Sequence, residues 1–247
     1  VSSRALALAG IDRSTPDPAD GRIERDPDGT PTGTLHEGAM NLVNRLLPVT
    51  SDEDMLRALL LGQEHLHSFG ITAWQDAIIG GYGDAGDAGP AYVHAIERGL
   101  LTGRVVGALW WDRNRGLEQV DELVDLRERY RAAGFAATSV KIMQDGVVEN
   151  FTAAMGEPYL GPDGAPTRGT GLSFVEPGLL ARAVTRMDAL GFQVHVHAIG
   201  DRAVRESLDA FEAALLVNGR TDNRHHIAHL QLVHPDDVPR FRELGVA

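Results

Sequence analysis

The segment GFQVHVHAIGDRAV, residues 191–204, contains the unit from which this chain is built. A glycine ends one helix, an apolar strand follows, and Asp201 begins the next helix. The same order recurs along the chain, with strands expected to begin near residues 71, 104, 139, 192 and 225. Most starts are roughly 33 residues apart, the length of a strand–helix unit that repeats with parallel strands.

A barrel of strands and helices fits this repeat better than a nucleotide-binding sheet, because no glycine-rich fingerprint follows the first strand. A (β/α)8 barrel of the TIM type needs eight strands in about 250 residues. We therefore expect residues 51–247 to form a partial barrel, about strands 2–6 with their helices, cut in mid-unit at the C-terminus. Residues 1–50 are expected to be a loop-rich, partly β insertion that packs on the barrel. Apolar stripes predict helices that end near Gly70, Gly99, Gly134, Gly191, Asn218 and Gly245.

Composition limits the possible functions. The net charge of −12 argues against nucleic-acid binding through phosphate neutralisation. Without cysteine there is no disulfide and no thiolate metal site. The sequence shows no apolar run of membrane-spanning length and no leader, so a cytoplasmic protein is the default expectation. An irregular stretch at 149–171 is expected to lie over the C-terminal face of the barrel, where active sites are built.

Lys141 is the one lysine among 23 basic residues. A position that keeps Lys in so Arg-rich a chain suggests a task that Arg cannot perform, because a desolvated Lys amine can lose its proton. A neutral amine can also take up carbon dioxide and become a carbamate, a bidentate anionic ligand for metals. A lysine that merely forms an ion pair or extends to solvent is the competing interpretation.

Histidines cluster after residue 194. His195 and His197 alternate in one strand, so they share a face. His225 and His229 are expected to share a face of the next strand, with His226 on the other. Lys141, His197 and His229 then lie at the C-terminal ends of neighbouring strands, which predicts a site for zinc or a similar divalent ion. A single histidine there is more often structural, and only the combination favours metal.

The segments VKIMQDGVVENFTA, VHVHAIGDRAV and RHHIAHLQLVHPDD resemble the amidohydrolase superfamily, specifically its amidohydrolase 3 group, which includes N-substituted formamide deformylases. The resemblance implies a metal-dependent hydrolase that acts on amide-type C–N bonds of a small-molecule substrate, with one or two divalent ions. It implies that Lys141 is a carboxylated bridging lysine and that His197 and His229 are metal ligands. Ala228 stands where family members often carry Glu. Residues expected to support the ligands or line the substrate cleft are Asp145, His195, Asp201, His225 and Trp111, with Trp110 beside it.

Two parts of the family pattern are absent from this sequence: a His-x-His pair from the first strand and the proton-accepting aspartate after the eighth. His65 and His67 have the right spacing but lie on a predicted helix, where they diverge. We therefore expect a central fragment that is weakly active or inactive alone, that binds metal poorly or not at all, and that self-associates through open barrel edges. A mononuclear deaminase-like hydrolase and a non-enzymatic binding module on a degraded barrel are the alternatives.

Overall fold

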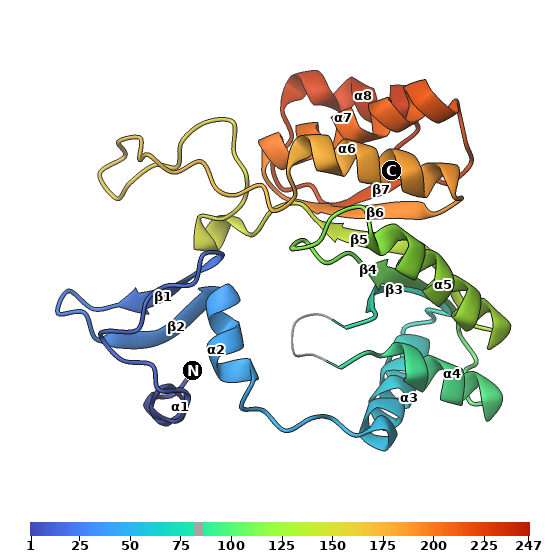
Figure 1. Cartoon of the computed structure of the whole chain (residues 1–247), viewed down its shortest axis with the longest axis horizontal. Coiled ribbons are helices and arrows are strands. Elements are labelled where there is room, and N and C mark those ends of the chain that lie inside the picture. Colours follow the sequence, from blue (N-terminus) through green and yellow to red (C-terminus); the bar gives the residue numbers. More distant parts are fainter. Residues whose placement is uncertain (82–85) are drawn as a thin grey trace. The chain divides into compact units, whose positions relative to one another are not determined.

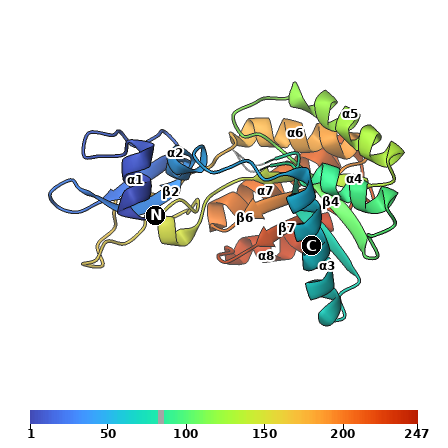
Figure 2. The same ribbon diagram turned by 90° about the horizontal axis from the view of Figure 1, so that it is seen from below.

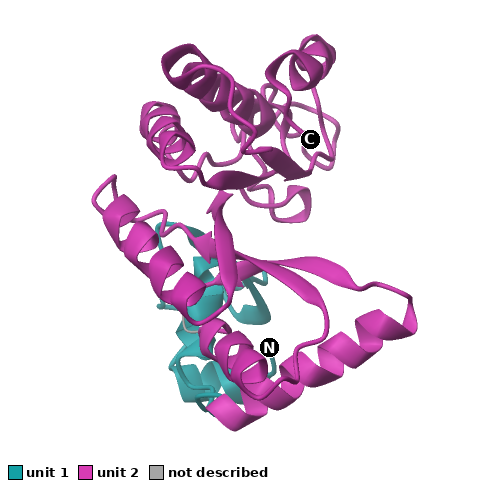
Figure 3. Ribbon diagram, turned by 90° about the vertical axis from the view of Figure 1, so that its right-hand side faces the viewer, with its two compact units in different colours: residues 1–51, 81–86 teal, residues 52–80, 87–247 magenta. Residues whose placement is uncertain are grey.

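A computed structural model describes residues 1–81 and 86–247. The chain divides into two compact units (Figure 3). The first comprises residues 1–51 and 81–86, and the second comprises residues 52–80 and 87–247.

The first unit is built around an antiparallel hairpin. Strands β1 (Gly21–Arg25) and β2 (Pro31–Glu37) pair from Gly21 opposite Glu37 to Arg25 opposite Pro31. Helix α1 (Ser3–Ala9), the 3₁₀ turn η1 (Gly38–Met40) and helix α2 (Asn41–Asn44) complete it (Figure 2). A small apolar core joins these elements through Leu6, Ile11, Ile23, Ala39 and Val43. The partly β character of this segment was predicted, whereas α1 and α2 were not.

The second unit is a curled sheet of five parallel strands in the order β3-β4-β5-β6-β7 (Figure 1). The strands are β3 (Ala73–Ile79), β4 (Arg104–Trp110), β5 (Ala136–Met143), β6 (Gln193–Ala198) and β7 (His226–His229). Ala247 pairs with the free side of β7, because its N–H donates to the His225 carbonyl and its own carbonyl accepts from Ile227. This half-barrel confirms the predicted partial TIM-type barrel.

One helix lies between each pair of consecutive strands, another precedes the first strand and another follows the last, and they lie against one face of the sheet (Figure 1). Each begins and ends close to the residues that the apolar stripes predict; α7, for example, spans the whole of the predicted range. The helices are α3 (Asp52–Ser68), α4 (Gly89–Glu97), α5 (Gln119–Ala132), α6 (Pro177–Ala189), α7 (Asp201–Asn218) and, after the 3₁₀ turn η3 (Pro235–Asp237), α8 (Val238–Leu244). None of the helices in the described ranges has the length and apolar character needed to cross a bilayer.

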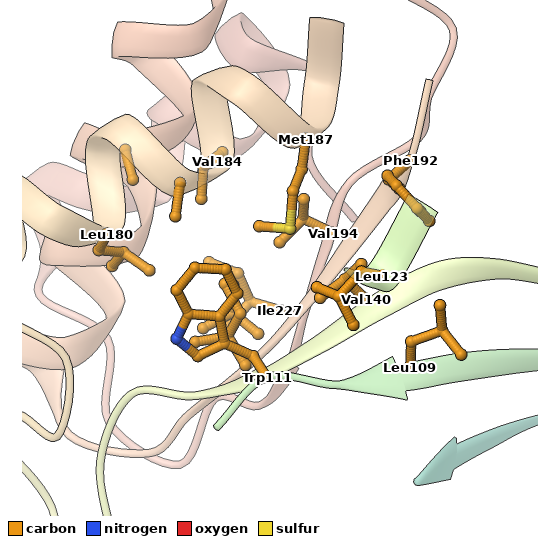
Figure 4. Packing of buried hydrophobic residues seen from close by; sticks show 14 of the residues in the cluster. Leu109, Trp111, Leu123, Val140, Leu180, Val184, Met187, Phe192, Val194 and Ile227 are labelled. Atoms are coloured by element: carbon orange, nitrogen blue, oxygen red, sulfur yellow. The ribbon is translucent and has the colours of Figure 1, made fainter. Parts of the chain in front are cut away.

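The main core fills the space between the sheet and these helices. Side chains from β4, β5 and β6 interlock with the inward stripe of α6, where Leu180, Val184 and Met187 are fully buried (Figure 4). Burying an aliphatic side chain of this size stabilises the fold by about 2 kcal/mol. Side chains on the outer face of each strand therefore pack in this core. Side chains on the inner face do not, and they can form a site.

The long connection between β5 and α6 is the irregular stretch expected from the sequence. It contains the short 3₁₀ turn η2 (Val148–Asn150) and an isolated bridge between Leu160 and Pro166. Its first residues continue from the end of β5, since the Gln144 N–H donates to the His197 carbonyl on β6. The connection thus leaves the sheet beside the candidate site.

Candidate metal centre

A row of basic side chains crosses three neighbouring strands on the inner face. Lys141 on β5 pairs in register with His195 on β6, which pairs with His226 on β7. Residues paired across parallel strands point to the same face and lie about 5 Å apart. The rings of His195 and His226 lie 4.2 Å apart between centroids. The fold thus places one amine and two imidazoles side by side.

His197 and His229 lie one step nearer the C-terminal ends of the strands. His197 pairs with Ala228, and His229 follows at the end of β7. The backbone of His229 has a left-handed φ of 84°, as does that of Leu230 at 47°. This bend brings the His229 ring to 4.5 Å from that of His197, measured between centroids. A non-glycine residue with positive φ is uncommon, and such strain tends to mark functional positions.

Burial keeps the two β6 imidazoles neutral. It lowers the pKa of His195 to about 3, with Lys141 the next largest influence, and that of His197 to about 4. The His197 Nε2 lies 3.2 Å from the Gly146 carbonyl, which can only accept, so this nitrogen carries the proton. Nδ1 of His197 is then the lone-pair nitrogen. A carbonyl that fixes the tautomer in this way is typical of metal-binding histidines.

Lys141, the single lysine, lies in the interior, as the presence of Lys in so Arg-rich a chain suggested. Lys141 is only 6% exposed, and burial lowers the pKa of its amine to about 8. The neutral fraction of the amine is therefore far larger at neutral pH than for a surface lysine. A neutral amine is the form that reacts with carbon dioxide.

Asp145 is fully buried at the start of the long connection. Its carboxylate accepts hydrogen bonds from the backbone N–H groups of Ala154, Ile199 and Gly200 at 2.8–3.0 Å. Burial raises its pKa to about 6, against the opposing effect of these donors. A Cβ at Gly200 would lie 2.0 Å from the Ala154 carbonyl, so this close approach requires glycine. Asp145, 3.5 Å from His197 Nε2, thus fastens the connection to the site.

Asp201 also orients the connection. Its Oδ1 accepts from the N–H groups of Gly156, at 2.8 Å, and of its neighbour Arg202. Arg202, which the sequence analysis did not select, donates to the Met155 and Thr170 carbonyls and to Ser173. Asp201 and Arg202 therefore bind residues in both the earlier and the later part of the connection, which agrees with a positioning role for Asp201.

The expectation that His225 and His229 share the inner face is wrong. His225 precedes β7, points toward the helices and stacks on Phe211 with ring centroids 5.0 Å apart. Its Nε2 donates to Asp188 at 3.0 Å, and its Nδ1 accepts from the Val194 N–H. The inner-face position belongs to His226, because side chains alternate along a strand and β7 begins there. His225 is thus a packing residue and does not support the ligands.

Trp111 does not line the inner face either. It is 1% exposed and packs in the core against the α6 stripe (Figure 4). Trp110, one residue earlier, pairs in register with Lys141 and so takes the inner-face position. The alternation of a strand separates the two tryptophans, so Trp110 and not Trp111 takes a position on the inner face.

The donor set suits a divalent transition metal only when Lys141 contributes an anion. Among the described residues, no group of three or more His, Cys, Asp or Glu side chains is placed to hold a metal ion. His197 and His229 supply two neutral imidazoles, and a carbamate on Lys141 would supply the missing oxygen ligands. The neutral rings, the fixed tautomer and the buried amine fit that arrangement.

The imidazoles and the buried lysine lie at the C-terminal ends of the strands, the end at which barrel enzymes build their active sites. The sequence model of the amidohydrolase family matches residues 1–247. The chain belongs to the amidohydrolase family, as the resemblance of its motifs predicted.

Individual matches agree with the family. The exoenzymes regulatory protein AepA of Pectobacterium carotovorum subsp. carotovorum is 34% identical over 98% of this chain and 50% of its own length. The N-substituted formamide deformylase of Arthrobacter pascens is 27% identical over 100% and 44%. The crystal structure of an uncharacterized metal-dependent hydrolase from Pyrococcus furiosus superposes with a TM-score of 0.65 and 25% identity, over 99% of this chain and 46% of that one. The chain spans about half the length of the curated relatives it matches.

Proposed function

We propose that Lys141, His197 and His229 form part of the metal centre of a hydrolase that cleaves amide-type C–N bonds. The observation that carries the proposal is the meeting of the His197 and His229 rings, 4.5 Å apart, beside a buried lysine. The names of the formamide deformylase and of the metal-dependent hydrolase support it. Zinc is the metal that best suits two imidazoles and a carboxylate-type ligand.

A bound divalent ion would polarise the substrate carbonyl and lower the pKa of a water molecule. The chain's own residues prepare the site for it. His197 presents Nδ1 because the Gly146 carbonyl holds the proton on Nε2. The backbone bend at His229 brings the second imidazole to the first, and Trp110 on β4 is the register partner of Lys141.

Asp145 is not the proton acceptor of the reaction in this proposal. Its oxygens are engaged by three backbone N–H groups, so it holds the connection and does not face a substrate. The proton-accepting aspartate that the family resemblance implies therefore has no counterpart here among the described carboxylates of this site. We infer that full activity needs ligands and a base beyond these residues.

Zinc titration followed by calorimetry tests the metal centre. His197→Ala and His229→Ala should each weaken zinc binding by at least roughly tenfold, since each removes a ligand nitrogen. His65→Ala, at an exposed position on α3, is the matched control and should bind as the unsubstituted chain does. Equal zinc affinity in all four proteins would overturn the assignment. Hydrolysis of N-substituted formamides, assayed in parallel, then tests the substrate class.

Self-association belongs to the same proposal. β3 and β7 are the edge strands of the five-stranded sheet, and the described part of β3 pairs on one side only. Unpaired strand edges are templates for pairing with another chain. An oligomer formed through β3 stays a prediction.

A further inference from the structure

His195 carries two of the four buried side-chain polar atoms that have no hydrogen-bond partner within the described residues. It is 8% exposed, and within the described residues neither Nδ1 nor Nε2 has a hydrogen-bond partner. An unpartnered buried polar group costs about 1–3 kcal/mol, and native proteins retain few of them. Such a group in a native fold calls for an explanation, and a missing ligand group is one. His226 beside it differs, since its ring interacts with the Arg224 carbonyl.

The surroundings of His195 are rich in basic groups and poor in anions. Lys141 is its direct partner on β5 and His226 its partner on β7, with His197 and His229 one step away. Asp145 is the nearby carboxylate, and its oxygens are occupied by backbone N–H groups. Five nitrogen-bearing side chains thus converge with no free carboxylate among those described. The inner face is built for a negative charge that the unmodified side chains do not supply.

We propose that His195 is a positioning residue whose ring N–H donates a hydrogen bond to a carbamate on Lys141. The inference rests on the proposed function, which gives Lys141 the carboxylated form. A neutral imidazole always carries one N–H, and in His195 this donor is free. The register places it opposite Lys141 on the same face of the sheet. The carbamate in turn supplies the anion that the cluster lacks.

The reaction at Lys141 balances without any further reactant. The lone pair of the neutral amine attacks the carbon of carbon dioxide and forms a C–N bond. One C–O π pair moves onto oxygen, one amine proton passes to water, and nothing is oxidised or reduced. Hydrogen bonds to charged acceptors are stronger than those between neutral groups, so the His195 donor favours the carbamate over the free amine.

Carbon-13 NMR of the whole chain in ¹³C-bicarbonate tests this role. We expect a carbamate resonance that is absent from Lys141→Arg, because a guanidinium does not form one. His195→Phe keeps a ring of similar shape without the N–H and should need at least roughly tenfold more bicarbonate for the same signal. His195→Gln keeps an N–H donor and should restore much of the signal. His65→Phe, exposed on α3, is the control for the substitution itself.

The outcomes separate this inference from the proposed function. A carbamate signal in His195→Phe equal to that of the unsubstituted chain overturns the role of His195 and leaves the lysine assignment intact. No signal from the unsubstituted chain at any bicarbonate concentration, with or without added zinc, overturns the lysine assignment and this inference together. Circular dichroism of each variant shows whether the fold is kept, and His195→Gln keeps the test valid should His195→Phe unfold.

Discussion

Two histidines, one on β6 and the other immediately before β7, lie on opposite sides of the same sheet. His225 faces the helices, where Asp188 and the Val194 N–H engage both of its nitrogens and Phe211 stacks on its ring. His195 faces the inside of the half-barrel, and neither of its nitrogens is engaged within the described chain. The two rings have the same chemistry and similar burial, yet their environments are opposite.

The difference separates a polar group that stabilises the fold from one that serves a site. Folding selects partners for every buried polar group because each unmade hydrogen bond costs free energy. Around His225, protein atoms alone meet this requirement. Around His195 they do not, and in our proposal a carbamate meets it. If the two sides of the sheet respond alike to substitution, this difference between them does not exist.

The largest effect is expected at the centre of the outer side. Asp188 on α6 is 3% exposed and accepts hydrogen bonds from Asn218, Thr221, Asn223 and His225 at 2.6–3.0 Å. Burial opposes its ionised form, but these four donors together lower its pKa. Asp188→Ala leaves the donors without their shared acceptor and should lower the free energy of unfolding by about 3 kcal/mol. Urea unfolding measures this directly.

Asp125→Ala is the matched control, because Asp125 is an exposed aspartate on α5. It should change the free energy of unfolding by less than about 0.5 kcal/mol. A similar small change for Asp188→Ala would mean that the four donors find water as easily as they find the carboxylate. The outer side would then not be a stabilising network.

A smaller effect, dependent on pH, is expected for His225→Phe. The substitution keeps the stack on Phe211 but removes the bonds to Asp188 and Val194, so it should cost about 1–3 kcal/mol near neutral pH. Burial lowers the pKa of His225 below its usual 6.5. The native ring therefore stays neutral where the unfolded ring begins to bind a proton.

The pH dependence follows from that direction. The contribution of His225 is fully present above pH 6.5 and is lost as the pH falls toward its lower folded-state pKa. The cost of His225→Phe should therefore shrink as the pH is lowered from 7.5 to 5. Denaturant unfolding at several pH values gives the profile. A cost that grows on acidification would show that the native state protonates His225, contrary to the tautomer inferred from its partners.

Much of the fold could be predicted from the sequence. The spacing of apolar residues indicates helices and strands, and glycines mark the ends of helices. The stripe of α7 and the glycines after α5 and α6 placed helix ends within one or two residues. Strands were placed within about three residues for the same reason. α1 and α2 were missed because they are only 7 and 4 residues long and lie in a segment rich in Pro, Asp and Gly. Helices that short depend on tertiary contacts and leave little pattern.

The positions of the candidate ligands could be predicted from the sequence, but the faces on which His225 and His226 lie could not. Lys141 and His197 lie where the alternation of long strands put them. β7 has four residues, so an error of one in its start exchanges the faces of His225 and His226. The turn at His229 depends on a positive φ, and the sequence does not indicate a positive φ at a residue other than glycine. Asp188 was missed although a signal existed, since it lies four residues after Val184 of the buried stripe.

The smallest effect is expected for His195→Phe. Removing a buried polar group that has no partner costs no hydrogen bond, and an apolar ring of similar shape suits the interior. The free energy of unfolding at pH 7.5, without added bicarbonate or metal, should stay within about 1 kcal/mol of the unsubstituted chain or rise. His225→Phe, the same substitution on the other face, sets the scale. If both variants lose about 2 kcal/mol, His195 is a structural residue like His225, and the two sides of the sheet do not differ. If only His225→Phe is destabilised, the inner face keeps its unpartnered imidazole for a reason other than folding.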